Sequence, residues 1–293
     1  MRIDELVEIG ARTTYRVGGR ARFGLTIEGE SDARAAHQWC SEHGLDTVII
    51  GRGSNTVVAD GDLELVAIDI DAPTELDCER VGDVWHVTAS ATWALPQLAR
   101  QLAENAVGGF EWAVGVPGSL GGAVAMNAGG HGGEMSQCVT QVRVLDLADG
   151  SLTWMSRDYL DFGYRHSSLS ATQVVLMVKM TLHVGSPEEL RERMAQIVSW
   201  RREHQPGGRN AGSVFRNPPG DHAARLIDEA GLKGARVGGA EVSTKHANFI
   251  QALDGATGRD VRDLVRHVQK VVAATTGVEL RTEIKFVGFA GES

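Results

Sequence analysis

The spacing of hydrophobic positions predicts three amphipathic helices in the chain of 293 residues. In each of them apolar residues recur three or four positions apart, which is the period of one helix face. These helices cover residues 31–43, 93–106 and 257–276. Terminal signals predict two more helices. One opens at the capping box Ser186-Pro187-Glu188-Glu189 and runs to about residue 204, and a shorter one, capped by Asp221, ends at Gly231.

Alternating or short apolar runs predict strands between these helices. The predicted strands are residues 13–23 (interrupted by Gly18-Gly19), 47–50, 57–58, 63–70, 84–91, 139–147, 173–184 and 278–287. Strands with few helices among them indicate an α+β protein rather than a regular succession of βαβ units. The length suggests two or three domains, and the capping box after Gly185 places a boundary near that residue.

Composition and charge exclude several classes of protein. With 42% hydrophobic and 23% charged residues the chain is globular, and its net charge of −9 argues against non-specific binding of nucleic acid. The three cysteines form neither a disulfide framework nor a zinc pattern, and the ten histidines show no pair at metal-ligand spacing, so we predict no bound metal. No apolar run has the length of a membrane span, and the acidic start is unlike a signal peptide. We therefore expect a soluble, cytoplasmic protein without a membrane partner.

Two glycine-rich stretches are the candidate phosphate-binding elements. Residues 51–55 read Gly-Arg-Gly-Ser-Asn after a short strand, and residues 115–130 contain six glycines. Backbone without side chains can approach an anion closely and present its N–H groups to it. The first turn lacks the third glycine of the doubly wound dinucleotide fingerprint and leads into a strand. Two such turns without that fingerprint favour a dinucleotide, and specifically a flavin, in another fold.

Eight ordered motifs over nearly the whole chain resemble those of the UDP-N-acetylenolpyruvoylglucosamine reductase family. They lie at residues 15–19, 50–55, 115–129, 164–167, 211–218, 230–234, 245–249 and 280–288. The resemblance implies an FAD-binding region of two subdomains, of the type found in certain flavin oxidases (PCMH type), at residues 1–71 and 72–184. It also implies a small α+β substrate domain at residues 185–293, whose last few residues return to the FAD region.

The resemblance further implies an NADPH-dependent flavoenzyme of peptidoglycan precursor synthesis. Such an enzyme reduces UDP-N-acetylglucosamine enolpyruvate to UDP-N-acetylmuramate, with the UDP-sugar and NADPH as its small-molecule partners, and a monomer is the favoured state. We expect non-covalent FAD, since the first turn offers no histidine or cysteine to tether it. The expected FAD-binding residues are Gly51, Arg52, Gly53, Ser54, Asn55, Gly115, Pro117, Gly118, Ser119, Gly121, Gly122 and Asn127.

Catalytic roles are likewise carried over by motif, because composition and spacing do not single out these residues. Arg165 and Glu283 would stabilise the negative charge that develops on the substrate, and Ser213 would donate a proton to carbon. The expected substrate-binding residues are Tyr164, Arg165, Arg209 and Asn217. The chain has no long insertion after Arg165, which matches the shorter subtype of the family, and the position after Gly130, often tyrosine, is His131.

Two other functions remain open from the sequence. The first is a sugar or lactone oxidase of the same flavin fold, although many of those tether flavin through a histidine in the first turn. The second is a non-catalytic nucleotide-sugar binding protein, which we would expect to have lost at least one of Arg165, Ser213 and Glu283.

Overall fold

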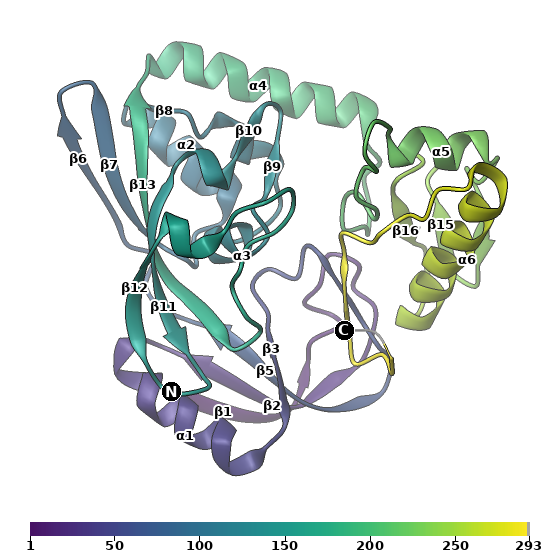
Figure 1. Ribbon diagram of the computed structural model, residues 1–293, viewed down its shortest axis with the longest axis horizontal. Helices are drawn as coiled ribbons and strands as arrows, with labels where there is room; N and C mark the ends of the chain where they lie inside the picture. The colour runs from purple at the N-terminus through teal and green to yellow at the C-terminus, as the bar shows by residue number, and fades with distance from the viewer. Residues whose placement is uncertain (292–293) are drawn as a thin grey trace. The chain divides into compact units, whose positions relative to one another are not determined.

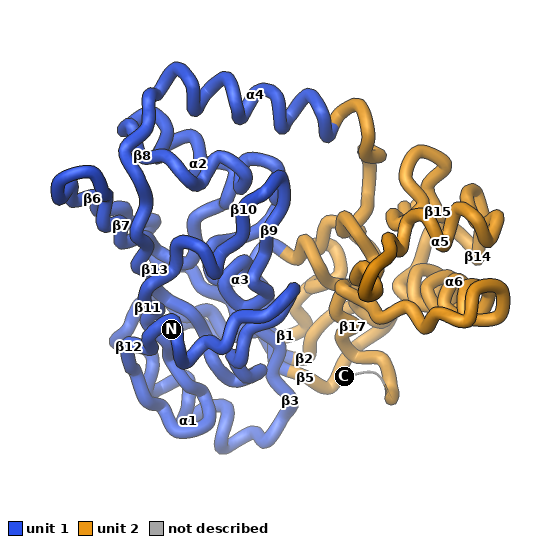
Figure 2. The backbone as a smooth tube through the Cα atoms, turned by 45° about the horizontal axis from the view of Figure 1, so that its top comes forward, with its two compact units in different colours: residues 1–4, 23–52, 66–201 blue, residues 5–22, 53–65, 202–293 orange. Residues whose placement is uncertain are grey.

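The computed structural model describes residues 1–291, and its backbone contacts group these residues into two compact units (Figure 2). Unit 1 contains residues 1–4, 23–52 and 66–201, and unit 2 contains the described residues of 5–22, 53–65 and 202–293. This grouping by contacts does not address the three-domain division expected from the sequence, which stays a prediction. None of the described helices is long and apolar enough to cross a membrane.

An antiparallel sheet of six strands dominates unit 1 (Figure 1). The strands pair antiparallel in the order β12-β11-β13-β7-β6, and β8 joins β13 at its end. Their bounds are β6 Leu76–Val81, β7 Val84–Ser90, β8 Val107–Gly108, β11 Val139–Asp146, β12 Leu152–Ser156 and β13 Gln173–Val184. Buried Leu95, Leu98 and Leu102 of α2 (Leu95–Glu104) belong to the same core as β13. Short α3 (Leu120–Ala125) and the buried face of α4 (Pro187–His204) complete that core.

A second sheet has the order β1-β2-β5-β3. The bounds of its strands are β1 Arg2–Glu8, β2 Arg20–Ile27, β3 Asp46–Ile49 and β5 Asp62–Ile70. Helix α1 (Ala33–His43) packs its buried alanines against Leu25, Ile27, Val66 and Ile68 of this sheet. A short hairpin of β9 (Gly129–Gly130) and β10 (Gly133–Glu134) and four 3₁₀ turns complete unit 1; the turns are η1 Glu30–Asp32, η2 Glu111–Gly115, η3 Met135–Gln137 and η4 Arg157–Leu160.

Unit 2 is built around helix α6 (Gly258–Thr276), whose apolar face packs on a three-stranded sheet. That sheet consists of β14 (Arg236–Val237), β15 (Ala240–Val242) and β16 (Ile250–Ala252). Helix α5 (Ala223–Glu229) contributes Leu226 and Ile227 to the same core. The last strand, β17 (Lys285–Val287), runs parallel to β4 (Thr56–Val58), so residues far apart in sequence are paired within unit 2.

The mixed content agrees with the predicted α+β class, and several predicted elements are confirmed closely. Strand β13 has the predicted bounds, and α6 begins with a capping box formed by Thr257 and Asp260 and ends at left-handed Gly277. Two strand predictions are wrong. Residues 13–19 form a turn in which Gly19 N donates to Ala59 O, and residues 278–284 make a single β-bridge at Thr282 rather than a strand.

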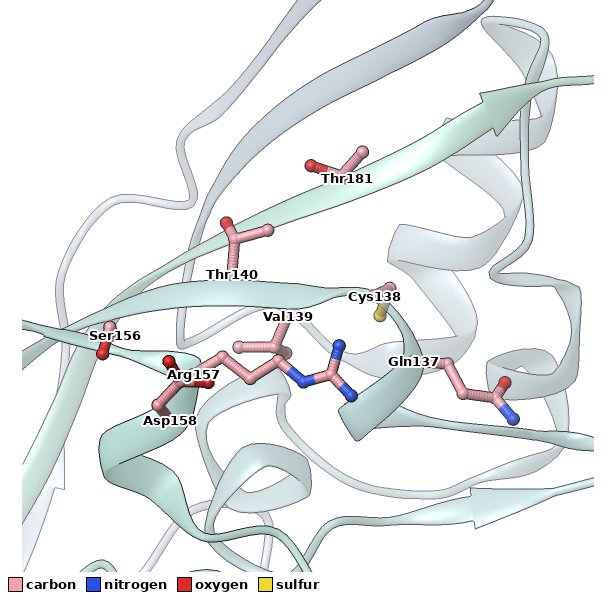
Figure 3. A pocket seen from close by; sticks show the side chains of 8 residues that line it. All are labelled: Gln137, Cys138, Val139, Thr140, Ser156, Arg157, Asp158 and Thr181. Atoms are coloured by element: carbon pink, nitrogen blue, oxygen red, sulfur yellow. The ribbon is translucent and has the colours of Figure 1, made fainter.

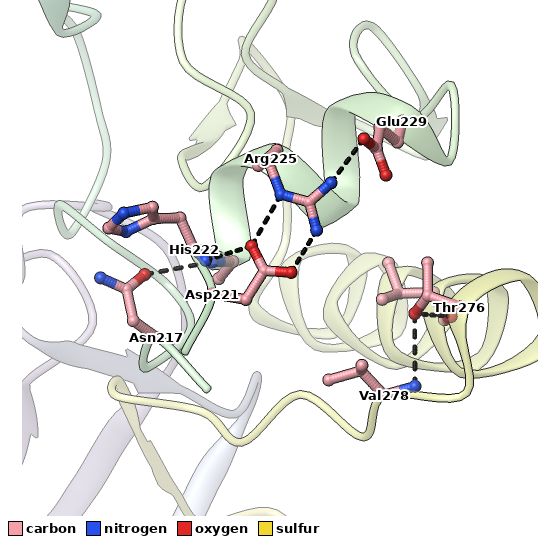
Figure 4. Close-up of polar contacts among 9 residues, drawn as sticks. Asn217, Asp221, His222, Arg225, Glu229, Thr276 and Val278 are labelled. Carbon is pink, nitrogen blue, oxygen red and sulfur yellow. Dashed lines mark hydrogen bonds and ion pairs between the residues drawn. The ribbon is translucent and has the colours of Figure 1, made fainter. Parts of the chain in front are cut away.

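The predicted cap of α5 is also wrong (Figure 4). Helix α5 begins at Ala223, whose N–H donates to Asn217 Oδ1 at 3.1 Å. Asp221 lies one residue too early to cap the helix, and its carboxylate binds the Arg225 side chain instead. This ion pair lowers the pKa of Asp221 to about 2.

Candidate active site

The first glycine turn requires glycine at Gly53 and packs closely at Gly51. Gly53 has φ +58°, and a Cβ there would lie 2.7 Å from Thr13 Cα, so no side chain fits. A Cβ on Gly51 would lie 2.5 Å from Ser119 Oγ within unit 1. The structure therefore brings Gly51 of the first stretch against Ser119 of the second, as two elements that share one ligand require.

The backbone donors of the first turn are available to a ligand. Within residues 1–291, the N–H groups of Gly51, Arg52, Gly53 and Ser54 donate to no acceptor of the chain. Consecutive amides of this kind make an anion-binding concavity. Asn55, the fifth predicted FAD-binding residue here, is fixed by its Nδ2, which donates to Glu283 O at 2.9 Å. This donor set fits the diphosphate of a dinucleotide.

The second glycine stretch differs, because most of its amides are already used. Gly118 N donates to Val116 O, Gly121 N to Ala91 O at 2.9 Å, and Gly122 N to Ser119 Oγ at 3.2 Å. A Cβ on Gly121 would lie 2.9 Å from Ala91 Cβ. Pro117 and Gly122 are exposed, whereas Gly115, Gly118 and Ser119 are buried. In this stretch glycine mainly permits close packing, and few backbone donors remain.

Asn127 supports the turn that carries Arg165. The Asn127 side chain is 1% exposed; its Nδ2 donates to Gly163 O and its Oδ1 accepts from Ser136 N, both at 2.9 Å. Both ends of this amide are therefore used inside unit 1. Residues Gly163 and His166 bond to each other across the turn, and Arg165 between them has φ +53°.

The Arg165 side chain is held against the same glycine stretch. Its Nη2 donates to Gly129 O at 2.8 Å, and its guanidinium lies 5.2 Å from the centre of the Tyr164 ring. Ser167 Oγ donates to Ala125 O at 2.9 Å and anchors the other end of the turn. Arg165 is half-buried and Tyr164 is exposed, so the pair lies at the surface of unit 1.

Ser213 and Glu283 lie on neighbouring backbone segments of unit 2. Glu283 N donates to Val214 O at 2.8 Å, and Phe215 forms a β-bridge with Thr282. Asn248 fixes the serine segment from the other side, since Val214 N donates to Asn248 O and Phe215 N to Asn248 Oδ1, both at 2.9 Å. The bond from Asn55 to Glu283 O adds the end of the first glycine turn to this group. Residues of four of the predicted motifs, at 50–55, 211–218, 245–249 and 280–288, thus meet in unit 2.

The remaining predicted substrate-binding residues have partners in the chain. Arg209 Nη2 lies 2.5 Å from Asp254 Oδ1, and its Nε donates to Ala252 O. Asn217 is exposed and caps α5 as described above. The Arg209 and Asn217 side chains both keep polar atoms that can bind a ligand, but each already makes a hydrogen bond within the chain.

A cavity of about 530 Å³ in unit 2 adds residues that the sequence did not single out. It is lined by residues 11–14, Arg16, Gly208 and Arg209. The Thr14 hydroxyl on this wall is buried and has no hydrogen-bond partner among the described residues. The sequence did contain a signal for this cavity. Arg12 and Arg16, which flank Thr13-Thr14, are two positive charges close together in a chain with a net charge of −9.

A second cavity, of about 400 Å³, lies in unit 1 and contains no predicted site residue (Figure 3). Cys138 is on its wall, and burial raises the pKa of this thiol to about 12, so it is not a nucleophile. Among the described residues no group of three metal-ligating side chains occurs. The predicted catalytic residues all lie outside this cavity, Arg165 in unit 1 and Ser213 and Glu283 in unit 2.

Comparisons with known proteins identify the family and the domains of the chain. Residues 24–156 match the model of an FAD binding domain, and residues 204–287 match the C-terminal domain of UDP-N-acetylenolpyruvoylglucosamine reductase. The UDP-N-acetylenolpyruvoylglucosamine reductase of Heliobacterium modesticaldum is 41% identical over 95% of this chain and 88% of its own. The enzyme of a Synechococcus strain is 38% identical over 97% of this chain and 95% of its own.

A solved structure extends the likeness to the whole fold. The crystal structure of UDP-N-acetylenolpyruvylglucosamine reductase from Thermus caldophilus superposes with a TM-score of 0.84 at 35% identity, covering 98% of this chain and 99% of that one. Fold and domain matches together define an FAD-dependent oxidoreductase with the predicted α+β architecture. The chain belongs to the UDP-N-acetylenolpyruvoylglucosamine reductase family.

Proposed function

We propose that this protein uses NADPH to reduce the enolpyruvyl ether of UDP-N-acetylglucosamine to UDP-N-acetylmuramate, a step of peptidoglycan precursor synthesis. The observation that carries the proposal is the match of nearly the whole chain to reductases of this name, at up to 41% identity for the proteins compared above. Arg165, Ser213 and Glu283, the residues expected to perform the chemistry, are all present.

The first glycine turn, with its free amides, and the second stretch hold FAD without a covalent bond. Bound FAD would supply the redox chemistry, the transfer of a hydride from NADPH to the terminal carbon of the enolpyruvyl group. Side chains of the protein perform every other part of the reaction: they bind the substrate, stabilise the developing negative charge and transfer protons.

Arg165 binds the substrate carboxylate and stabilises the negative charge that runs into it. Its position is well supported, because the turn that carries it is bonded to Asn127, Ala125 and Gly129. A guanidinium held in place before the reaction does not have to reorganise as charge develops, which is the source of its advantage over water.

Ser213 protonates the carbon next to the carboxylate. A serine hydroxyl is a weak acid, so it depends on its surroundings, and the hydrogen bond between Glu283 N and Val214 O fixes the segment of Glu283 next to that of Ser213. We assign to Glu283 the hydrogen bonding of the same negatively charged intermediate. Tyr164, Arg209 and Asn217 contribute to binding the sugar nucleotide.

Anaerobic stopped-flow absorbance tests this function in two stages. NADPH should bleach the flavin band of the purified protein, and the enolpyruvyl nucleotide sugar should then restore it. Oxygen consumption with a free sugar or lactone, without any dependence on NADPH, would show an oxidase instead. A protein that binds the UDP-sugar but is not reduced by NADPH would be a binding protein.

A further inference from the structure

Asn248 bonds to the two residues that follow Ser213 with both its side chain and its backbone. Its Oδ1 accepts from Phe215 N at 2.9 Å, and its Nδ2 donates to Phe215 O at 2.8 Å. Its backbone O accepts from Val214 N, also at 2.9 Å. Asn248 is only 4% exposed, so these bonds are shielded from water. A side-chain amide that pairs with both backbone groups of one residue acts as a neighbouring strand would, because it offers the same donor and acceptor.

The opposite edge of the same segment pairs with the segment of Glu283. Val214 O accepts from Glu283 N at 2.8 Å, and Arg216 N donates to Arg281 O at 2.9 Å. Val214 is thus bonded through its N–H to Asn248 and through its C=O to Glu283, and all of these residues lie in unit 2. The register between the Ser213 and Glu283 segments therefore depends on the asparagine that holds the other edge.

The chain before Ser213 is held less firmly. Gly212 has φ +75°, and a Cβ built on it would meet nothing within 4 Å. Its N–H donates to Asn210 Oδ1 at 3.0 Å, a bond to a side chain that is only half-buried. A glycine next to open space can pivot, because no side chain packs there. The bonds on the C-terminal side of Ser213 therefore decide where the serine lies.

We propose that Asn248 is a positioning residue for the proton transfer from Ser213, and this inference rests on the proposed function. A proton donor must lie within about 2.6–3.2 Å of the atom that it protonates. A misplacement of about 1 Å can slow a reaction about 10²-fold. Because both ends of its amide bind Phe215, Asn248 acts through the backbone that carries Ser213 and not on the substrate. It holds Ser213 in register with Glu283 while charge develops on the substrate.

The first test measures both half-reactions of Asn248→Ala holoenzyme by anaerobic stopped-flow. Reoxidation of the flavin at saturating enolpyruvyl substrate should slow about 10- to 100-fold, with the substrate concentration for half-maximal rate little changed. Reduction by NADPH should stay within about 2-fold of wild type, because it needs no proton from Ser213. Thr257→Ala is the control: it removes the cap of α6, whose Oγ1 accepts from Asp260 N at 3.1 Å, and so destabilises unit 2 without touching residues 213–216.

Asn248→Asp supplies a readout that loss of stability alone would not give. The variant keeps the size of the side chain and the acceptor for Phe215 N, but its ionised form sets a carboxylate oxygen against Phe215 O. Its protonated form can donate to Phe215 O and restore both bonds. Burial and the facing carbonyl should raise the pKa of the introduced carboxyl above its ordinary value of about 3.9. Reoxidation should therefore recover towards wild type as the pH falls, whereas reduction by NADPH should show no such titration.

The neighbouring titratable groups are the same in every variant. His246 Nδ1 accepts from Asn248 N at 3.3 Å, and burial and the charge of Lys233 lower the pKa of His246. Glu283 lies on the segment that pairs with Val214. Because wild type and Asn248→Ala contain these groups as well, the ratio of their rates to those of Asn248→Asp isolates the titration of the introduced carboxyl.

Three results would overturn the proposal. Asn248→Ala may slow reoxidation no more than Thr257→Ala does, or it may slow both half-reactions equally, and either result gives Asn248 a structural role only. Should Asn248→Ala fail to fold, an Asn248→Asp variant whose reoxidation does not recover at low pH decides against the proposal by itself. Wild type separates this failure from that of the proposed function: if the enolpyruvyl substrate does not reoxidise wild-type flavin, the function is wrong and the role of Asn248 falls with it.

Discussion

Replacing Asn127 by alanine should destabilise the protein by about 3–5 kcal/mol. The change removes the acceptor of the buried Ser136 N–H, which costs about 1–3 kcal/mol, and one of the two donors to Gly163 O, which adds about 0.5–1.5 kcal/mol. Asn127 also has φ +44°, a left-handed conformation that asparagine tolerates and that costs alanine about 1 kcal/mol.

Asn127→Gly separates these contributions, because it loses the same hydrogen bonds without the backbone strain. Urea unfolding of the holoenzyme, followed by fluorescence, should rank stability as wild type, then Asn127→Gly, then Asn127→Ala, with about 1 kcal/mol between the two variants. Because Asn127 fixes the turn of Arg165, both variants should also slow flavin reoxidation by the enolpyruvyl substrate more than reduction by NADPH.

Two results would contradict this reasoning. An alanine variant within about 1 kcal/mol of wild type would mean that the two hydrogen bonds contribute little. Equal slowing of both half-reactions would mean that Asn127 acts on FAD, as the sequence suggested, rather than on the Arg165 turn.

The remaining predictions concern the reaction and the cofactor. Ser213→Ala should leave flavin reduction by NADPH nearly unchanged and slow reoxidation by at least about 10²-fold, since only the second step needs a proton; unaltered reoxidation in stopped-flow would remove Ser213 from the mechanism. Arg165→Ala should impair the same step and raise the KM for the enolpyruvyl substrate, because its charge meets the carboxylate in ground and transition states alike; an unchanged KM would refute that contact. Gly118→Val should purify with little or no FAD, as a branched side chain would occupy a buried position in the glycine stretch, and full flavin occupancy would contradict this. Acid precipitation of the wild-type protein should release all the yellow colour, whereas flavin retained in the pellet would show a covalent bond.

Elements whose signals are local could be predicted from the sequence. Helix α6 carries its capping box, its apolar stripe and its terminal glycine within its own residues, and β13 its own apolar run. Residues 13–19 could not be predicted as a turn, because their shape depends on Gly19 approaching Gly61, where a Cβ would lie 1.7 Å from Gly61 O. The segment before Lys285 likewise follows its contacts with Val214 and Gln269 rather than its own alternation.

For the candidate site, motifs identified which segments matter but not what each side chain does. Asn127 lies in a motif assigned to FAD, and only the acceptors and donors around its amide show that both ends are used to support another loop.

The two glycine stretches show most directly why composition is an incomplete guide to a phosphate site. Both are rich in glycine and both were expected to present amides to FAD. In the first, four successive N–H groups donate to no acceptor within residues 1–291, so the backbone itself can bind an anion. In the second, the amides of Gly118, Gly121 and Gly122 are bonded internally, and glycine is needed where Ala91 and Arg201 approach. A stretch of the second kind contributes close approach rather than donors, so glycine content alone does not show which backbone amides a ligand can reach.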